Sequence, residues 1–242
     1  MPAWLSHRSE HHDLGMPVRH GFDRERCIAH SELCGLQRFR AQLREAHAGA
    51  GRRFRRPAAA LAEQMMTHSL PADAGAWAAL LADHVASVFY THATQSNKPE
   101  GAARLFDGYT PYAVHPTWCA MTLLQEPLLD VRLRYRGSLA LLYHDIPEDT
   151  SGKLPEALES EVVELVAGMT FASFDEEVEE LWNRPIEVHL LKLYDKTSNW
   201  LDGTWMKPRK KARYRELIER LCDSAAAEYG PLNIVRLARS LL

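Results

Sequence analysis

Residues 109–150 read YTPYAVHPTWCAMTLLQEPLLDVRLRYRGSLALLYHDIPEDT, and this stretch decides both the expected fold class and the candidate site. A turn-rich segment leads into one apolar helical pattern, and a second apolar run ends in a histidine and an aspartate. The stretch carries five side chains suited to metal binding or acid–base chemistry: His115, His144, Asp145, Glu148 and Asp149. A helical hairpin would bring these imidazoles and carboxylates together. We therefore expect a site for a divalent metal ion and its bound water.

Length and composition predict a globular protein of one ordinary domain with room for a small addition. The chain has 242 residues, of which 46% are hydrophobic and 25% charged. Its net charge of −3 gives no general electrostatic reason to bind nucleic acid, so we expect no nucleic-acid partner. The oligomeric state stays open.

Nothing in the sequence predicts a membrane partner. No apolar run approaches the roughly 20 residues that span a bilayer, and the N-terminus lacks the apolar core of a secretory signal. The four cysteines form no CxxC pair, which is typical of reduced thiols. We therefore expect a cytoplasmic location.

Residues 1–72 differ from the rest of the chain. Val18 and Ile28 are the only β-branched aliphatic residues before Val85, and seven arginines fall between Arg38 and Arg56. So few apolar groups can hardly offset the entropy cost of ordering this segment. We expect an N-terminal extension that is mobile or partly helical. A basic arm that docks on RNA or on another subunit is the alternative.

From residue 73 onward the apolar residues follow helical spacing, and nothing resembles alternating strands or a repeat. We expect an all-α bundle of about six to eight helices. The expected helices include a stripe through residues 77–92, a helix entered at Pro116, helices over 138–145 and 154–169, one entered near Pro185, and helices over 213–227 and 232–242. Trp118, Met121, Leu124 and Leu128 would form the buried side of the second helix. Pro147 disfavours helical geometry at Ile146, so the chain should bend just past the His-Asp pair.

Asp195 is the third element of the candidate site. It lies within the apolar segment HLLKLYDKTSNW, where a buried and unpaired carboxylate would cost several kcal/mol. It therefore needs a cation, which Lys192, Lys196 or a metal ion would supply. Two imidazoles and two carboxylates suit manganese, iron or zinc, with manganese favoured by the carboxylates. Helix capping and ion pairing are the alternative for the same residues.

The segments PYAVHP, LLYHDIPEDT and KLYDKTSN, in this order, resemble the HD-domain hydrolases of the RelA/SpoT group, and most closely the stand-alone alarmone hydrolases. The resemblance covers roughly residues 80–225 and implies that 73–242 form an all-α HD phosphohydrolase domain. It implies metal ligands, with manganese as the first choice, at His115, His144, Asp145 and Asp195. It implies that Glu148 and Asp149 activate the water that attacks (p)ppGpp, giving GDP or GTP and pyrophosphate. It also implies nucleotide contacts by Lys98, Lys196, Asn199 and Tyr214.

The sequence departs from the family on the wall that recognises the base. Ser96 and Asn97 stand where the family has an arginine that packs on guanine, and Ser198 stands where histidine or tyrosine is common. The connection over residues 99–109 is also about ten residues long, longer than the resemblance predicts. These differences leave two alternatives open: hydrolysis of another nucleotide, including NADPH, and a catalytically silent nucleotide-binding protein.

Other polar residues have a simpler interpretation. We expect His92 to be a core histidine or to support a ligand, and His189 to lie on another side of its helix from Asp195, about 240° away. A basic cluster forms a solvated surface that could attract polyphosphate. Its members are Lys207, Arg209, Lys210, Lys211 and Arg213.

Overall fold

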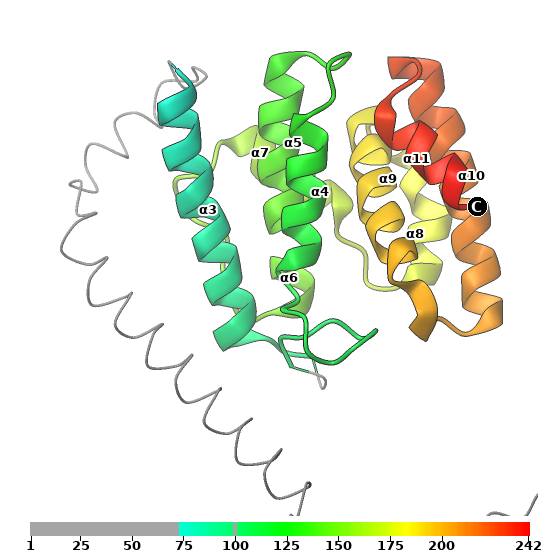
Figure 1. Cartoon of the computed structure of the whole chain (residues 1–242), viewed down its shortest axis with the longest axis horizontal. Coiled ribbons are helices and arrows are strands. Elements are labelled where there is room, and N and C mark those ends of the chain that lie inside the picture. Colours follow the sequence, from blue (N-terminus) through cyan, green and yellow to red (C-terminus); the bar gives the residue numbers. More distant parts are fainter. Residues whose placement is uncertain (1–72, 99–100) are drawn as a thin grey trace, which may run out of the picture. The chain divides into compact units, whose positions relative to one another are not determined.

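A computed structural model describes residues 73–98 and 101–242, all within one compact unit (Figure 1). The expectation for the N-terminal extension, residues 1–72, lies outside the described residues. Within the described ranges the chain forms nine α-helices and two short 3-10 helices, with isolated β-bridges and no strand. One of the nine, α6, is a single turn of four residues. The expected all-α bundle is confirmed.

The helices follow one another with short connections. Their bounds are α3 (Ala74–Gln95), α4 (Val114–Leu124), α5 (Val131–Tyr143), α6 (Ile146–Asp149), α7 (Ser160–Met169), α8 (Phe174–Glu180), α9 (Ile186–Leu201), α10 (Pro208–Tyr229) and α11 (Asn233–Leu241). The 3-10 helices are Leu181–Asn183 and Gly203–Trp205. None of these described helices is both long enough and apolar enough to cross a membrane.

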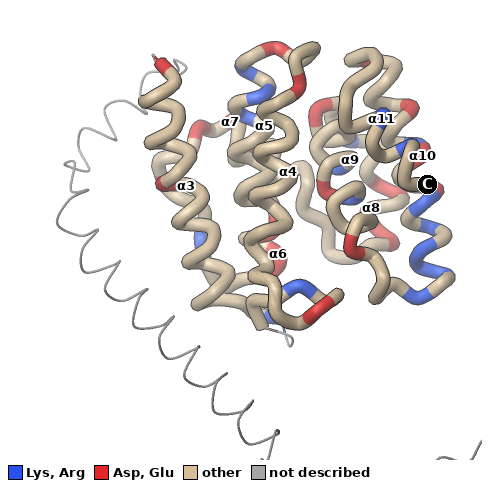
Figure 2. The backbone as a smooth tube through the Cα atoms, in the orientation of Figure 1, with Lys and Arg blue, Asp and Glu red and all other residues tan. Residues whose placement is uncertain are grey.

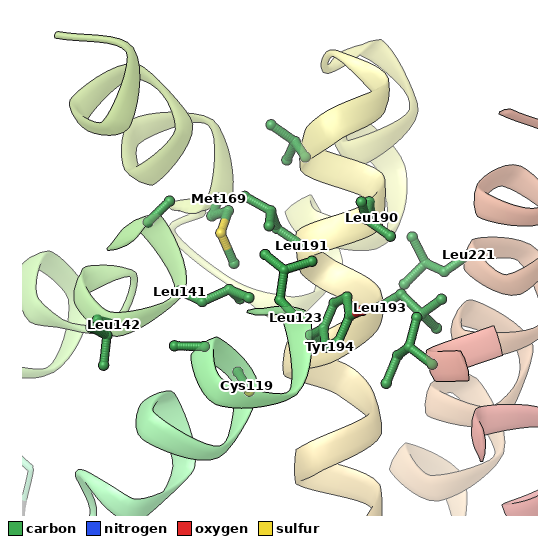
Figure 3. Close-up of a cluster of buried hydrophobic side chains, with 14 of the residues drawn as sticks. Cys119, Leu123, Leu141, Leu142, Met169, Leu190, Leu191, Leu193, Tyr194 and Leu221 are labelled. Atoms are coloured by element: carbon green, nitrogen blue, oxygen red, sulfur yellow. The ribbon is translucent and has the colours of Figure 1, made fainter. Parts of the chain in front are cut away.

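The α4–α5 hairpin and α9 form the centre of the bundle. Helix α4 packs against both α5 and α9, while α3 and α7 lie against α5, and α10 and α11 lie against α9. The core between them is built from leucines of α4, α5 and α9 with Tyr194 and Met169 (Figure 3). Gly137 allows the close approach within the hairpin, because a Cβ there would lie 2.6 Å from Leu123 Cδ2. The hairpin predicted from the sequence thus forms, with α9 laid against it.

The predicted starts of three helices were wrong. Helix α5 begins at Val131, not near residue 138, because the Asp130 side chain accepts hydrogen bonds from two backbone N–H groups of its first turn. Gly137 is therefore a packing residue inside the helix and not its boundary. Helix α7 begins at Ser160, six residues after the predicted start at 154, and α10 begins at Pro208, five residues before the predicted start at 213.

The predicted buried face of α4 was also wrong. Its fully buried side chains are Cys119, Ala120 and Leu123, next to His115, and Leu128 is 57% exposed. Trp118 and Met121 pack only partly against the core. The helix is therefore rotated so that the histidine, and not the indole, faces the centre of the bundle.

Candidate metal centre and substrate cavity

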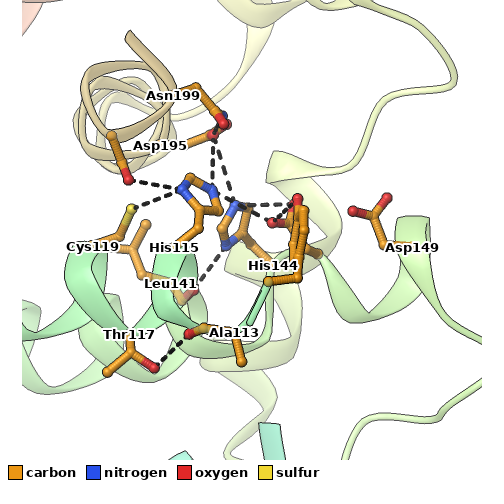
Figure 4. A network of polar contacts seen from close by, with 12 residues as sticks. Ala113, His115, Thr117, Cys119, Leu141, His144, Asp149, Asp195 and Asn199 are labelled. Carbon is orange, nitrogen blue, oxygen red and sulfur yellow. Dashed lines mark hydrogen bonds and ion pairs between the residues drawn. The ribbon is translucent and has the colours of Figure 1, made fainter. Parts of the chain in front are cut away.

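Four buried side chains from separate parts of the sequence converge between α4, α5 and α9 (Figure 4). His115 lies in the first turn of α4, and His144 directly follows α5. Asp145 precedes α6, and Asp195 projects from the middle of α9. The fold thus brings together the four residues that the sequence predicts as metal ligands.

The spacing of their atoms suits a shared ion. His115 Nε2 lies 3.5 Å from Asp145 Oδ2 and 3.4 Å from Asp195 Oδ1. His144 Nε2 lies 3.1 Å from Asp145 Oδ1 and 3.9 Å from Asp195 Oδ1. Ligand atoms of His115, His144 and Asp145 all fall within 4.8 Å of one another. Two ligands bound at roughly 2.1 Å to one divalent ion are themselves roughly 3.0–3.5 Å apart, close to these values.

The hydrogen bonding of the two imidazoles also fits a metal ion. His144 Nδ1 lies 2.8 Å from the carbonyl oxygen of Leu141, which can only accept, so Nδ1 carries a proton. His115 Nδ1 lies 2.9 Å from Ser198 Oγ. The Nε2 atoms of both rings are buried and have no hydrogen-bond partner among the described residues. Their nearest polar neighbours are the oxygens of Asp145 and Asp195, and imidazole nitrogens that converge with carboxylates in this way commonly bind a cation.

Each carboxylate is oriented by a neutral donor. The Tyr112 hydroxyl donates to Asp145 Oδ2 at 2.9 Å, and Asn199 Nδ2 donates to Asp195 Oδ1 at 2.6 Å. Groups of this kind fix the direction of metal ligands and commonly tune metal affinity. All four candidate ligands are therefore held by a second group before any ion binds.

Charge is unevenly shared among the ligands. Burial disfavours the charged form of His144, but Asp145 and Asp195 outweigh it and raise the pKa of His144 to about 9. Burial lowers the pKa of His115, and the same two carboxylates only partly oppose this. One imidazole therefore carries positive charge between two carboxylates. A divalent cation would supply more positive charge in the same place.

Asp195 also belongs to a buried cluster of lysines. Its Oδ2 lies 3.2 Å from Lys192 Nζ and 3.1 Å from Lys196 Nζ, and Glu177 pairs with both lysines at 3.0 and 2.7 Å. Burial alone would raise the pKa of Asp195, but Lys196 and Lys192 hold it well below its usual range. The two lysines thus supply the positive charge that this buried acid requires next to Oδ2, while Oδ1 faces the two histidines.

A cavity of about 370 Å³ opens beside the centre. Eight of the ten predicted site residues line it: Lys98, Asp145, Glu148, Asp149, Asp195, Lys196, Asn199 and Tyr214. The two histidines do not line it and are almost fully buried. The volume lies within the usual range of small-molecule sites, and the lining is rich in charged groups of both signs.

The two acids predicted to handle water are held on different sides. Glu148 Oε1 accepts from the backbone N–H of Phe171 at 3.2 Å, while Asp149 Oδ1 pairs with Lys98 Nζ at 2.6 Å. Desolvation raises the pKa of both acids, and Asp145 adds to this, although a neighbouring lysine opposes it in each case. A carboxylate with a raised pKa is a stronger base than an ordinary one.

The wall opposite α4 is aromatic and basic. Phe174 stacks on Tyr214 with ring centroids 4.8 Å apart, and Lys196 Nζ lies 5.5 Å from the Tyr214 centroid. Lys210 Nζ lies 4.8 Å from the centroid of Trp205. Lys210 belongs to the predicted basic cluster, which runs along the start of α10 (Figure 2). That cluster is mostly exposed, but Lys210 faces the cavity.

Two other histidines lie outside the ligand group. His92 is buried, with its ring centroid 4.9 Å from that of Tyr112. His189 Nδ1 lies 2.9 Å from Ser224 Oγ, and its Nε2 lies 3.0 Å from the Leu181 carbonyl oxygen. Both placements agree with the interpretation drawn from the sequence.

The sequence did not predict several residues of the cavity. Arg104 and Tyr112 come from the long connection before α4, and Glu177 comes from an acidic run that was interpreted as a solvated face. Arg104 is only 5% exposed. A lone arginine close to the first histidine, in a segment rich in turn residues, was the only available signal. Glu177 gave none, because its neighbours in α8 are indeed mostly exposed.

Comparison with known proteins supports the fold. No family model matches the chain, and no curated protein matches it. Among solved structures, a metazoan orthologue of SpoT, described as hydrolysing ppGpp and acting in starvation responses, superposes with a TM-score of 0.50 at 18% identity. The match covers 66% of this chain and 92% of that one. The chain has the fold of that hydrolase. The predicted HD-domain bundle, and the resemblance to this group at the level of the fold, are confirmed.

Proposed function

We propose that this protein is a metal-dependent phosphohydrolase. One observation carries the proposal: the buried Nε2 atoms of His115 and His144 converge on the carboxylates of Asp145 and Asp195 beside a cavity lined with charge. Ion pairing with the two carboxylates is the alternative for these imidazole nitrogens, and the charged cavity beside them favours the metal site.

Manganese is the preferred ion for this ligand set, and iron or zinc also suits it. When bound, such an ion polarises a phosphoryl oxygen and lowers the pKa of a water molecule. The chain's own contribution is to orient the four ligands and to exclude bulk water from the two histidines.

Glu148 and Asp149 are the proposed proton acceptors for the attacking water. Both line the cavity close to the ligands, and both have raised pKa values. Lys98 neutralises part of the charge of Asp149 and so lets an anionic substrate approach. The proposed substrate contacts are Lys98, Lys196, Asn199 and Tyr214.

The proposed substrate is an alarmone of the (p)ppGpp type, with GDP or GTP and pyrophosphate as products. This rests on the likeness of the fold to a protein described as hydrolysing ppGpp and on the ordered sequence segments. A second candidate is another phosphorylated nucleotide, including NADPH. It is favoured by Ser96, which stands where the family has its base-packing arginine and whose hydroxyl donates to the Gly101 carbonyl oxygen at 2.9 Å.

A nucleotide panel with product identification tests the proposal. Full-length protein with Mn²⁺ is incubated with ppGpp, pppGpp, GTP and NADPH, and the products are separated by ion-exchange chromatography. Pyrophosphate released from (p)ppGpp supports the first candidate, whereas orthophosphate released from GTP or NADPH alone supports the second. Asp145→Asn should abolish turnover, and Asp223→Asn, which alters an exposed carboxylate paired with Arg239, should not. If no nucleotide gives a product, the proposed hydrolase activity is contradicted and a catalytically silent nucleotide-binding protein is favoured.

A further inference from the structure

We propose that the hairpin of residues 101–113 is a positioning device for the metal centre, in which Arg104 and Tyr112 together hold the two acidic ligands in place. The inference rests on the proposed metal site and goes beyond it, because it assigns roles to Arg104 and Tyr112, for which the resemblance implies none.

The hairpin is rigidly built. Residues Ala103 and Pro111 form an antiparallel bridge, and the backbone N–H groups of Arg104 and Tyr112 donate across it at 2.8 and 2.6 Å. At the tip the Asp107 carboxylate accepts three hydrogen bonds from Tyr109 and Thr110, and Gly108 adopts a positive φ of 65°. Hydrogen bonds within the hairpin therefore fix the backbone positions of Arg104 and Tyr112.

Arg104 fixes the orientation of the side-chain amide of Asn199. Its Nη2 donates to Asn199 Oδ1 at 2.9 Å, and its Nε donates to Asp202 Oδ2 at 2.8 Å. A guanidinium can only donate, so the amide oxygen of Asn199 must face it. The NH₂ group of Asn199 is then directed at Asp195 Oδ1, the oxygen that faces both histidines.

Tyr112 acts on the other carboxylate from the same hairpin. Its hydroxyl donates to Asp145 Oδ2, and the guanidinium carbon of Arg104 lies 5.2 Å from the centroid of its ring. Both acidic ligands are thus oriented through the hairpin, one through Asn199 and one directly. Arginine is required at position 104, because a lysine ammonium has no fork to bond Asp202 and Asn199 at fixed geometry.

Manganese affinity in the absence of substrate tests the inference. The dissociation constant of Mn²⁺ is measured by isothermal titration calorimetry for full-length wild type, Arg104→Met, Asn199→Ala, Tyr112→Phe and the Arg104→Met/Asn199→Ala double variant. We expect each single variant to bind Mn²⁺ roughly 10-fold more weakly, as is typical when a group that orients a ligand is removed. The double variant should be no weaker than Asn199→Ala alone, because Arg104 acts through that amide. Arg104→Lys should not restore wild-type affinity.

Arg136→Met is the matched control. Arg136, like Arg104, is a largely buried arginine; it pairs with the carboxylates of Glu159 and Glu161 and does not line the cavity. Its loss should leave Mn²⁺ affinity unchanged. If Arg104→Met does not fold, two other variants carry the test: Asn199→Ala, which removes the hydrogen bonds to Arg104 and Asp195, and Tyr112→Phe, which removes the one to Asp145.

The possible outcomes separate the two proposals. Wild type that binds no divalent ion overturns the metal centre and the hairpin's role with it. Wild type that binds Mn²⁺ while the three single variants match it overturns only the positioning role. Additive losses in the double variant would also overturn it, because Arg104 would then not act through Asn199.

Discussion

Replacing Asp195 by asparagine should destabilise the metal-free protein by about 3 kcal/mol, beyond abolishing metal binding. The change keeps the shape of the side chain and removes one negative charge. Lys192 and Lys196, both almost fully buried, then share the single carboxylate of Glu177.

The size of this loss in stability follows from the interactions that remain in the Asp195→Asn variant. Removing one partner of a buried ion pair costs about 3–5 kcal/mol, because the other charge stays buried without compensation. Glu177 still contacts both lysines at 3.0 and 2.7 Å, and the repulsion between Asp195 and Asp145 is relieved. Both effects favour the lower end of that range.

Urea denaturation in the presence of EDTA measures this loss. A fall of about 3 kcal/mol corresponds to a drop in midpoint of roughly 1–3 M for ordinary slopes. Asp145→Asn is the matched control, since Asp145 pairs with histidines and no lysine among the described residues. Its loss should cost only about 1 kcal/mol, because His144 can release its proton and the Tyr112 hydroxyl keeps an acceptor. Equal losses in the two variants, or a loss below about 1 kcal/mol in Asp195→Asn, would refute the reasoning.

Three further outcomes follow from the same structure. Mn²⁺ at 100 times its dissociation constant should stabilise wild type by about 2.7 kcal/mol in thermal denaturation but leave Asp145→Asn unchanged, and equal shifts would contradict the site. Burial lowers the pKa of His84 to about 4, so the unfolded chain takes up the proton first and stability is lost as pH falls from 6.5 toward 4. This amounts to about 2 kcal/mol at pH 5, and His84→Asn should lose correspondingly less than wild type between pH 8 and 5 in urea denaturation. Glu126→Ala should cost about 3 kcal/mol in the same assay, because the buried carboxylate accepts from the first backbone N–H groups of α11 and from Tyr194; a loss below about 1 kcal/mol would count against this capping role.

The sequence predicted the helical class and brought out the four candidate ligands because both depend on local patterns. Apolar residues at helical spacing marked the helices; His115, His144 and Asp145 fell at the ends of those patterns, and Asp195 stood out as an acid inside one. The error at Gly137 has a physical cause. Glycine is disfavoured inside a helix, so it was interpreted as a boundary, whereas here it makes room for Leu123 and Leu191 of neighbouring helices.

The surroundings of the ligands could not be predicted in the same way. Asp195 was expected to need Lys192, Lys196 or a metal ion, and the structure gives it both lysines on one oxygen. Glu177, which completes that cluster, and Arg104, which orients Asn199, reach the site only through the packing of α8 and of the hairpin on α9. Such contacts depend on tertiary structure, which leaves no mark in local spacing.

A break between α5 and α6, next to Pro147, lies beside the candidate ligands. Helix α5 ends at Tyr143 and α6 begins at Ile146, with Asp145 at ψ −7° between them, so the chain turns directly after the two ligands. The Asp149 backbone N–H donates to the Asp145 carbonyl oxygen at 2.9 Å, and its side chain meets Lys98 beyond α3, whereas Glu148 meets the backbone before α8. The two acids therefore belong to different walls of the cavity, and a group bound between them would be flanked on both sides by carboxylates whose pKa values are raised.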